Sequence, residues 1–120
     1  MTNQIIKLLC FDAKESANGN SDRRNYGNNR YIYSNLRQWL NSDAAAGQWY
    51  TAQHSADAPP STANVWDGVN QYQTLAGFLN GFTANERAAL LATTITVGKS
   101  STDGGGTETC VDKVFPLSCT

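Results

Sequence analysis

The stretch YSNLRQWLN, residues 33–41, decides the fold because it predicts a short helix around which a core can form. Leu36, Trp39 and Leu40 lie at helical spacing, which places them on one face. Ser34 is positioned to cap this helix, since a serine oxygen accepts hydrogen bonds from the free amides of a first turn. The other face is polar and is either a binding surface or the solvated side of a core helix. It carries Asn35, Arg37, Gln38 and Asn41.

The composition is that of one domain with a modest core and a weakly charged surface. The chain has 120 residues, of which 40% are hydrophobic and only 16% are charged. A net charge of −1 and a pI of about 5.6 argue against broad binding to a phosphate backbone, so no nucleic-acid partner is expected. Arg23, Arg24 and Arg30 cluster in sequence, but three cations without a wider basic stripe are typical of a solubilising loop.

The sequence predicts neither a membrane span nor a secretory signal. No apolar run approaches the ~18 residues that a spanning helix needs. The first residues, MTNQIIKLLCFDAKES, contain an apolar run that is too short for a signal peptide. If the protein leaves its cell, we therefore expect it to do so without a classical signal or inside a larger particle.

The cysteines predict no disulfide framework and no metal centre. Cys10, Cys110 and Cys119 are odd in number and widely spaced, and no C-x-x-C motif accompanies the single histidine, His54. Without a signal peptide, free thiols in a reducing compartment are the expectation.

Local patterns predict short elements separated by long loops. Residues 4–11 are apolar and predict a strand, residues 12–30 predict an exposed loop, and residues 42–73 are irregular, with Pro59-Pro60 excluding a helix. Residues 74–82 predict helical turns interrupted by Gly77 and Gly81.

The C-terminal half predicts a capped helix followed by a hairpin. Thr83 and Glu86 form an S/T-x-x-E capping box, so we expect a helix over about 84–92 that buries Leu90 and Leu91. Residues 94–98 alternate as in a strand, with Ile95 on one face together with Val97. Residues 100–108 predict a turn rich in glycine, and residues 109–117 predict a strand that pairs back, with Pro116 near its end.

Five segments in this order resemble one known family. They are CFDAKES, YGNNRYIYSNLRQWLN, WYTAQHSADAPP, GFLNGFTANERAALLATT and VDKVFPLS. The set resembles DUF6273, a family of bacterial and phage domains, from about Leu8 to Ser118. The resemblance implies an origin in phage or prophage tail regions or in surface proteins of Gram-positive gut bacteria. It therefore implies a phage particle or a cell surface as the location if the chain belongs to a larger assembly, and otherwise the host cytoplasm. It also implies a compact α+β domain similar to C-type lectins and the formylglycine-generating enzyme, with two short helices, a small antiparallel sheet and long loops.

The family pattern extends further than this sequence. Its members continue after the segment equivalent to residues 111–118 with a tryptophan-rich stretch and a closing strand, and an additional strand often precedes residues 4–11. We therefore expect residues 1–120 to be a single domain that is truncated relative to the family. Uncovered strand edges then favour a homo-oligomer or pairing with another protein.

The long aromatic loop is the leading candidate for ligand binding. Aromatic faces stack on sugars and amides hydrogen-bond to hydroxyls, while the alternative is that the rings fill a core. These aromatic candidates are Trp49, Tyr50, Trp66 and Tyr72. His54 and Asp57 suggest an acid–base pair, but no nucleophile motif accompanies them, and a role in holding the loop is favoured.

Two further hypotheses concern charged residues. Arg37 and Asp112 both lie in the segments that resemble the family, and they are expected to form a bidentate pair that holds the helix to the sheet. Phe115 is expected to have a structural role. Calcium, which many lectin-like domains bind, remains open as a cofactor, although its candidate ligands are dispersed and lack a D-x-D-x-D-G loop. Those ligands are Asp57, Asp67, Asp103 and Asp112.

Together these patterns favour a non-enzymatic domain that recognises a protein or a glycan through aromatic loops. A different class of function is a small phage-encoded regulator that binds and blocks a host protein. The third is an oxidase of the formylglycine-generating type, which is disfavoured because neither Cys110 nor Cys119 has an evident basic neighbour except Lys113 to lower its pKa.

Overall fold

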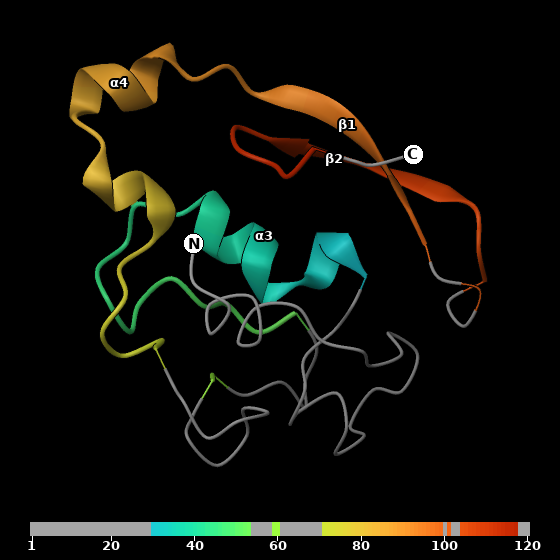
Figure 1. Cartoon of the computed structure of the whole chain (residues 1–120), viewed down its shortest axis with the longest axis horizontal. Coiled ribbons are helices and arrows are strands. Elements are labelled where there is room, and N and C mark those ends of the chain that lie inside the picture. Colours follow the sequence, from blue (N-terminus) through green and yellow to red (C-terminus); the bar gives the residue numbers. More distant parts are fainter. Residues whose placement is uncertain (1–29, 54–58, 61–70, 100, 102–103, 118–120) are drawn as a thin grey trace.

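The protein is a small α+β domain with two short helices and one two-stranded antiparallel sheet (Figure 1). The computed structural model describes residues 30–53, 59–60, 71–99, 101 and 104–117. Along the described chain a 3-10 helix η1 (Tyr31–Tyr33) leads into helix α3 (Asn35–Leu40). A second 3-10 helix η3 (Phe78–Gly81) precedes helix α4 (Ala84–Ala89). Strands β1 (Thr93–Gly98) and β2 (Thr107–Asp112) follow.

Helix α3 forms where the sequence predicts it, and its first turn is capped as expected. The Ser34 hydroxyl accepts a hydrogen bond from the backbone N–H of Arg37 at 3.1 Å and donates one to the carbonyl of Tyr31 at 2.8 Å. The cap therefore also joins α3 to η1. The apolar face buries Trp39 and Leu40 almost completely, while Leu36 packs against them at the margin of the core.

Helix α4 begins at the predicted capping box but ends earlier than predicted. Thr83 donates its backbone N–H to the Glu86 carboxylate at 2.7 Å, and Glu86 donates its own to the Thr83 hydroxyl at 3.2 Å. The expected continuation to residue 92 is wrong, because Leu90 already adopts an extended backbone. The expected burial of Leu91 is wrong as well: its side chain is 79% exposed, since the chain is there turning toward β1 rather than packing a helical face.

The predicted hairpin is present. β1 and β2 pair antiparallel, with Thr93 opposite Asp112 and Gly98 opposite Thr107. Ile95 and Val97 are half-buried on one face, as the alternation predicts. The three consecutive glycines 104–106 all have positive φ, a backbone region that glycine enters without a steric penalty, and they allow the chain to reverse within this turn. The predicted extent of the second strand, residues 109–117, is wrong at both ends, because β2 begins at Thr107 and ends at Asp112. Beyond it, Lys113 and Val114 donate their N–H groups to Asn41 instead of continuing the ladder.

The core is aromatic and its polar atoms are satisfied by backbone carbonyls. Trp39, Leu40, Trp49 and Tyr72 form the buried cluster. The indole N–H of Trp39 donates to the carbonyl of Ala76 at 2.9 Å, and that of Trp49 donates to Leu75 at 2.8 Å. Tyr72 packs edge-to-face on Trp49 with ring centroids 4.9 Å apart. The rings thus fix the segment after residue 71 as well as filling volume.

Residues 42–47 and residues 72–79 lie against each other beside this core. Gly47 donates its N–H to the carbonyl of Tyr72 at 2.8 Å, and Gly77 and Leu79 donate theirs to Ala44 and Ser42, both at 2.9 Å. The contact is closest at Gly77, where a Cβ atom would lie 2.3 Å from the Ser42 carbonyl oxygen. A hydrogen at this position is therefore required for the backbones to approach.

Several of the predicted features lie outside the described residues. The strand expected over residues 4–11 and the candidates His54, Asp57 and Trp66 lie outside the described residues. Phe115 is half-buried. None of the helices in the described part of the chain is long and apolar enough to cross a membrane.

Substituting Gly77 tests the close approach of the two segments. Gly77→Ala forces its methyl group against the Ser42 backbone, and we expect it to lower the free energy of unfolding by about 1–3 kcal/mol, as overpacking does. Gly81→Ala is the matched control, because a Cβ there meets nothing within 4 Å and its φ is not positive. Urea denaturation of the two variants measures the difference, and equal stabilities would contradict the proposed steric requirement.

Candidate functional site

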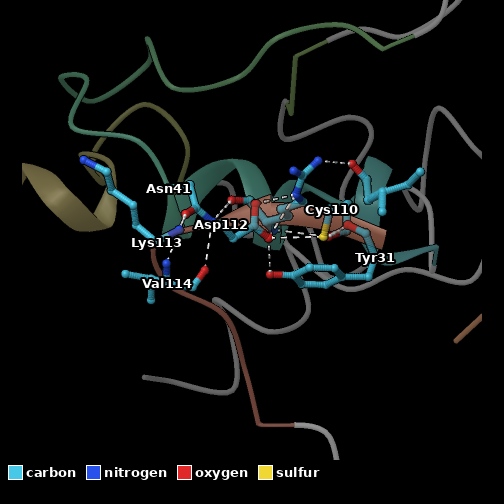
Figure 2. A network of polar contacts seen from close by, with 9 residues as sticks. Tyr31, Asn41, Cys110, Asp112, Lys113 and Val114 are labelled. Carbon is cyan, nitrogen blue, oxygen red and sulfur yellow. Dashed lines mark hydrogen bonds and ion pairs between the residues drawn. The ribbon is translucent and has the colours of Figure 1, made fainter. Parts of the chain in front are cut away.

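A buried carboxylate joins helix α3 to strand β2. Asp112 is 4% exposed and accepts hydrogen bonds from Arg37 Nε at 2.9 Å on Oδ1 and 3.1 Å on Oδ2. The Tyr31 hydroxyl donates to Oδ2 at 3.1 Å, and the Cys110 thiol lies 3.5 Å from the same oxygen. Figure 2 shows Tyr31 and Cys110 directed toward the Asp112 carboxylate. The predicted ion pair between Arg37 and Asp112 is present, but it is not the predicted bidentate pair: a single nitrogen, Nε, contacts both carboxylate oxygens, and Nη1 donates to the carbonyl of Ile32.

The alternation of β2 explains why these groups meet. Glu108, Cys110 and Asp112 occupy one face of the strand, which is the less exposed face. Arg30 reaches Glu108 with Nε 2.9 Å from Oε1, forming a second ion pair between the helical segment and the hairpin. The inward face of β2 is therefore polar, and each of its carboxylates has an arginine partner.

The two groups that contact the Asp112 carboxylate, the Cys110 thiol and the Tyr31 hydroxyl, both have raised pKa values. Burial, together with the negative charge of Asp112, raises the pKa of the Cys110 thiol above its ordinary value. The same two causes raise the pKa of the Tyr31 hydroxyl. A nucleophilic thiol requires the opposite shift, since the thiolate is the reactive form. The Cys110 environment therefore suits a structural thiol rather than one that supports oxidase chemistry.

Asn41 is a second link between α3 and the segment after β2, and sequence reasoning missed it. Its Oδ1 accepts from the backbone N–H of Lys113 at 2.8 Å and of Val114 at 3.1 Å. Its Nδ2 donates to the carbonyls of Val114 at 2.9 Å and Arg37 at 3.1 Å. The Asn41 amide thus donates to and accepts from the backbone of the segment that follows β2, as a neighbouring peptide group would (Figure 2). The only available signal was its place directly after the helix, on the polar face.

An open cleft of about 540 Å³ lies beside the polar face of α3. This volume is within the usual range for small-molecule sites. Helix α3 contributes one wall and the segments after it contribute another, and the end of β2 completes the lining. The lining residues are Ile32, Arg37, Gln38, Asn41, Ser42, Asp43, Trp49, Thr51, Gln53, Val111 and Asp112.

Several groups of the cleft keep hydrogen-bonding capacity. Gln38 uses its Oε1 to accept from the backbone N–H of Thr51 at 2.6 Å, and its amide nitrogen has no partner within the described part of the chain. Asp43 has a side chain that is 64% exposed, with Arg87 Nε 3.7 Å away. Thr51 is exposed. The cleft is therefore lined by hydrogen-bond donors and acceptors that are either neutral or close to a group of opposite charge.

The described aromatic residues that were proposed as ligand contacts are buried or half-buried. Trp49 and Tyr72 are each 4% exposed, and the Tyr72 hydroxyl donates to the carbonyl of Gly47 at 2.6 Å. Of the two roles open to these rings, the structure shows core packing, which leaves neither ring face free to stack on a sugar. Tyr50 is half-buried against Tyr72, with centroids 6.2 Å apart. The cleft groups Gln38, Asp43 and Thr51 were not predicted as ligand contacts, although the helical periodicity places Gln38 on the polar face.

The described residues contain no group of three or more His, Cys, Asp or Glu side chains that could hold a metal ion. Among the aspartates considered for calcium, Asp57, Asp67 and Asp103 lie outside those residues. Asp112 is described, and its oxygens are engaged by Arg37 and Tyr31.

The contribution of the Asp112 pair can be measured by removing one charge. Asp112→Asn leaves the Arg37 guanidinium without its counter-ion, and we expect the free energy of unfolding to fall by about 2–3 kcal/mol, below the full cost for deeply buried pairs because Arg37 is 27% exposed. Asp43→Asn is the control with the same chemical change, and it should cost less than about 1 kcal/mol because that pair is long and exposed. Similar losses in urea titrations of both variants would refute the structural role of Asp112.

The raised pKa of Cys110 predicts slow alkylation. Iodoacetamide reacts with the thiolate, so at pH 8 it should alkylate Cys110 more slowly in the folded protein than in the urea-unfolded chain. Mass spectrometry of the Cys110 peptide measures the two rates. Asp112→Asn should increase the rate in the folded state, because it removes one charge that raises the thiol pKa. A folded-state rate above the unfolded one would show a reactive thiol instead.

Comparison with known proteins identifies the family without adding a functional assignment. No curated protein and no solved structure matches the chain significantly, so the likeness to lectins and to the formylglycine-generating enzyme stays a prediction. A family model, described as a domain of unknown function, matches residues 1–120. The chain therefore belongs to the DUF6273 family, as its ordered motifs predict.

Proposed function

We propose that this chain is a non-enzymatic binding domain that recognises a glycan in the cleft beside α3. The observation that carries the proposal is the combination of an open cleft of about 540 Å³ with uncommitted polar groups on its walls. Recognition of this kind needs fixed donors and acceptors and does not need a nucleophile or an activated acid.

The charge balance of the cleft favours a neutral, hydroxyl-rich ligand. Arg37 is compensated by Asp112 at 2.9 Å, and Asp43 has Arg87 at 3.7 Å. The Gln38 amide can donate to a hydroxyl oxygen, and the exposed Asp43 carboxylate can accept from a hydroxyl hydrogen. A sugar offers both functions on adjacent carbons. The phage or bacterial-surface origin expected from the family resemblance points to cell-wall and capsular polysaccharides as the first ligands to examine.

The environment of Cys110 supports recognition over catalysis. An enzyme of the formylglycine-generating type depends on thiols of low pKa, whereas the pKa of Cys110 is raised by burial and by Asp112. The recognising surface we propose also differs from the aromatic loop favoured by the sequence, because Trp49 and Tyr72 have their rings in the core. Only the edge of this aromatic cluster, at Trp49, contributes to the cleft lining.

A glycan array followed by calorimetry tests the proposal. The unmodified protein should bind at least one class of neutral bacterial oligosaccharide, and Gln38→Ala should weaken binding about tenfold, the effect of losing one hydrogen bond. Gln48→Ala is the matched control, since Gln48 is an exposed glutamine outside the cleft lining. Circular dichroism of both variants confirms folding.

Two results would contradict this function. One is an absence of binding to neutral and acidic glycans alike, and the other is glycan binding that Gln38→Ala leaves unchanged. Preferential binding of acidic glycans would contradict the charge argument specifically.

A further inference from the structure

Within the described part of the chain, strand β1 has a neighbouring strand on one edge only, so its outer edge is unpaired there. β1 pairs with β2 along one edge, and the sheet contains no other strand among the described residues. Arg37 and Asn41 tie β2 and the segment after it to α3, so β2 lies on the side of the helix and β1 lies beyond it (Figure 1).

The register defines which backbone groups point to this open edge. Lys99 donates its N–H to the carbonyl of Gly106 at 2.9 Å, just beyond the pair formed by Gly98 and Thr107. Because hydrogen-bonded and non-hydrogen-bonded pairs alternate in an antiparallel ladder, Ile95 and Val97 direct their backbone groups toward β2. The intervening residues Thr94, Thr96 and Gly98 direct theirs outward.

This edge lacks the features by which proteins prevent strand pairing. Soluble proteins protect exposed edges with charged side chains, proline or bulges. The strand TTITVG contains neither charge nor proline, and its register with β2 is continuous without a bulge. Leu91, two residues before the strand, is 79% exposed. We propose that the β1 edge pairs antiparallel with the β1 edge of a second copy of this chain.

A second copy fits this edge for reasons of symmetry and charge. Two identical strands related by a two-fold axis pair antiparallel automatically, and no like charges meet because β1 carries none. Residues that are paired across an antiparallel sheet point to the same side, so the two-fold axis must lie midway between the two copies of one residue. If that residue is Thr96, Ile95 lies opposite Val97 of the second copy. The half-buried apolar positions of both hairpins then form one continuous row on the inner face of a four-stranded sheet.

Hydrogen exchange in the unmodified protein tests the pairing directly. In the dimer the amides of Thr94, Thr96 and Gly98 should exchange slowly, and dilution should accelerate them in parallel with the appearance of monomer in light scattering. The amides of Ile95 and Val97 should stay protected at every concentration, since they belong to the hairpin. A protein that remains monomeric at NMR concentrations overturns the proposal, and so does protection of Thr96 in a proven monomer, which would assign the edge to the same chain.

A proline substitution provides an independent test. Thr96→Pro removes an outward N–H from each copy, and proline is tolerated at such edge positions, so the dimer dissociation constant should rise about tenfold or more while the hairpin persists. Thr109→Pro is the matched control: Thr109 is opposite Thr96 and is exposed, but its N–H points away from β1. Equal dissociation constants for the two variants, with both folded, would also overturn the proposal. Neither test depends on glycan binding.

Discussion

The pair between Arg37 and Asp112 is the contact on which the placement of the hairpin depends. The buried cluster Trp39, Leu40, Trp49 and Tyr72 belongs to α3 and the segments around it. Among the described hydrophobic residues from β1 onward, Val114 alone packs against this cluster. Within the described residues, the hairpin is joined to the helical part mainly by ion pairs and hydrogen bonds. Such contacts are directional, so they define one orientation where an apolar surface would permit several.

A polar interface of this kind carries a cost that the structure offsets by complete pairing. A buried carboxylate without partners would be strongly unfavourable, but Asp112 accepts from Arg37 and Tyr31. Asn41 extends the same principle without charge, because all four of its hydrogen bonds go to the neighbouring backbone. The network favours the native position of the hairpin, because a shifted hairpin would leave charges buried and unpaired, at a high cost in free energy.

The same network shapes the cleft. Arg37 is drawn toward Asp112 and Ile32, and Gln38 is held by its contact with Thr51, so the α3 wall presents groups whose positions are already restricted. Binding to restricted groups costs less conformational entropy than binding to free side chains. The polar face of α3 is therefore more than the solvated side of a core helix: part of it holds the hairpin, and part of it lines the cleft.

Sequence patterns predict the features that depend on neighbours along the chain. The Ser34 cap, the Thr83–Glu86 capping box and the hairpin all follow from local spacing. The charged pair of Arg37 with Asp112 is an exception, because it is a tertiary contact that was predicted from the family resemblance of the two segments and their opposite charges. Leu91 shows the limit of this reasoning: its helical spacing suggests burial, whereas the chain has already left the helix.

Features that depend on tertiary approach were beyond the sequence. An aromatic ring such as Trp49 or Tyr72 serves a core and a ligand site equally well, and only the surrounding carbonyls of Leu75 and Gly47 decide between them. The need for glycine at position 77 arises from a backbone 35 positions away in sequence, at Ser42. The cleft depends on the same kind of contact, because α3 supplies one wall and Asp43 and Thr51 supply another.

The cleft and the β1 edge occupy different sides of β2, and this separation gives the two proposals a physical connection. The cleft is lined by Val111 and Asp112 at the end of β2, whereas pairing uses the edge of β1 that points away from β2. A dimer joined through β1 therefore keeps both clefts accessible and related by a two-fold axis. Shallow, open sites bind single sugars weakly, and two linked sites on a repeating polysaccharide bind more tightly through effective concentration. In the proposed dimer, strand pairing would therefore raise the avidity for such a polysaccharide above the affinity of one open cleft.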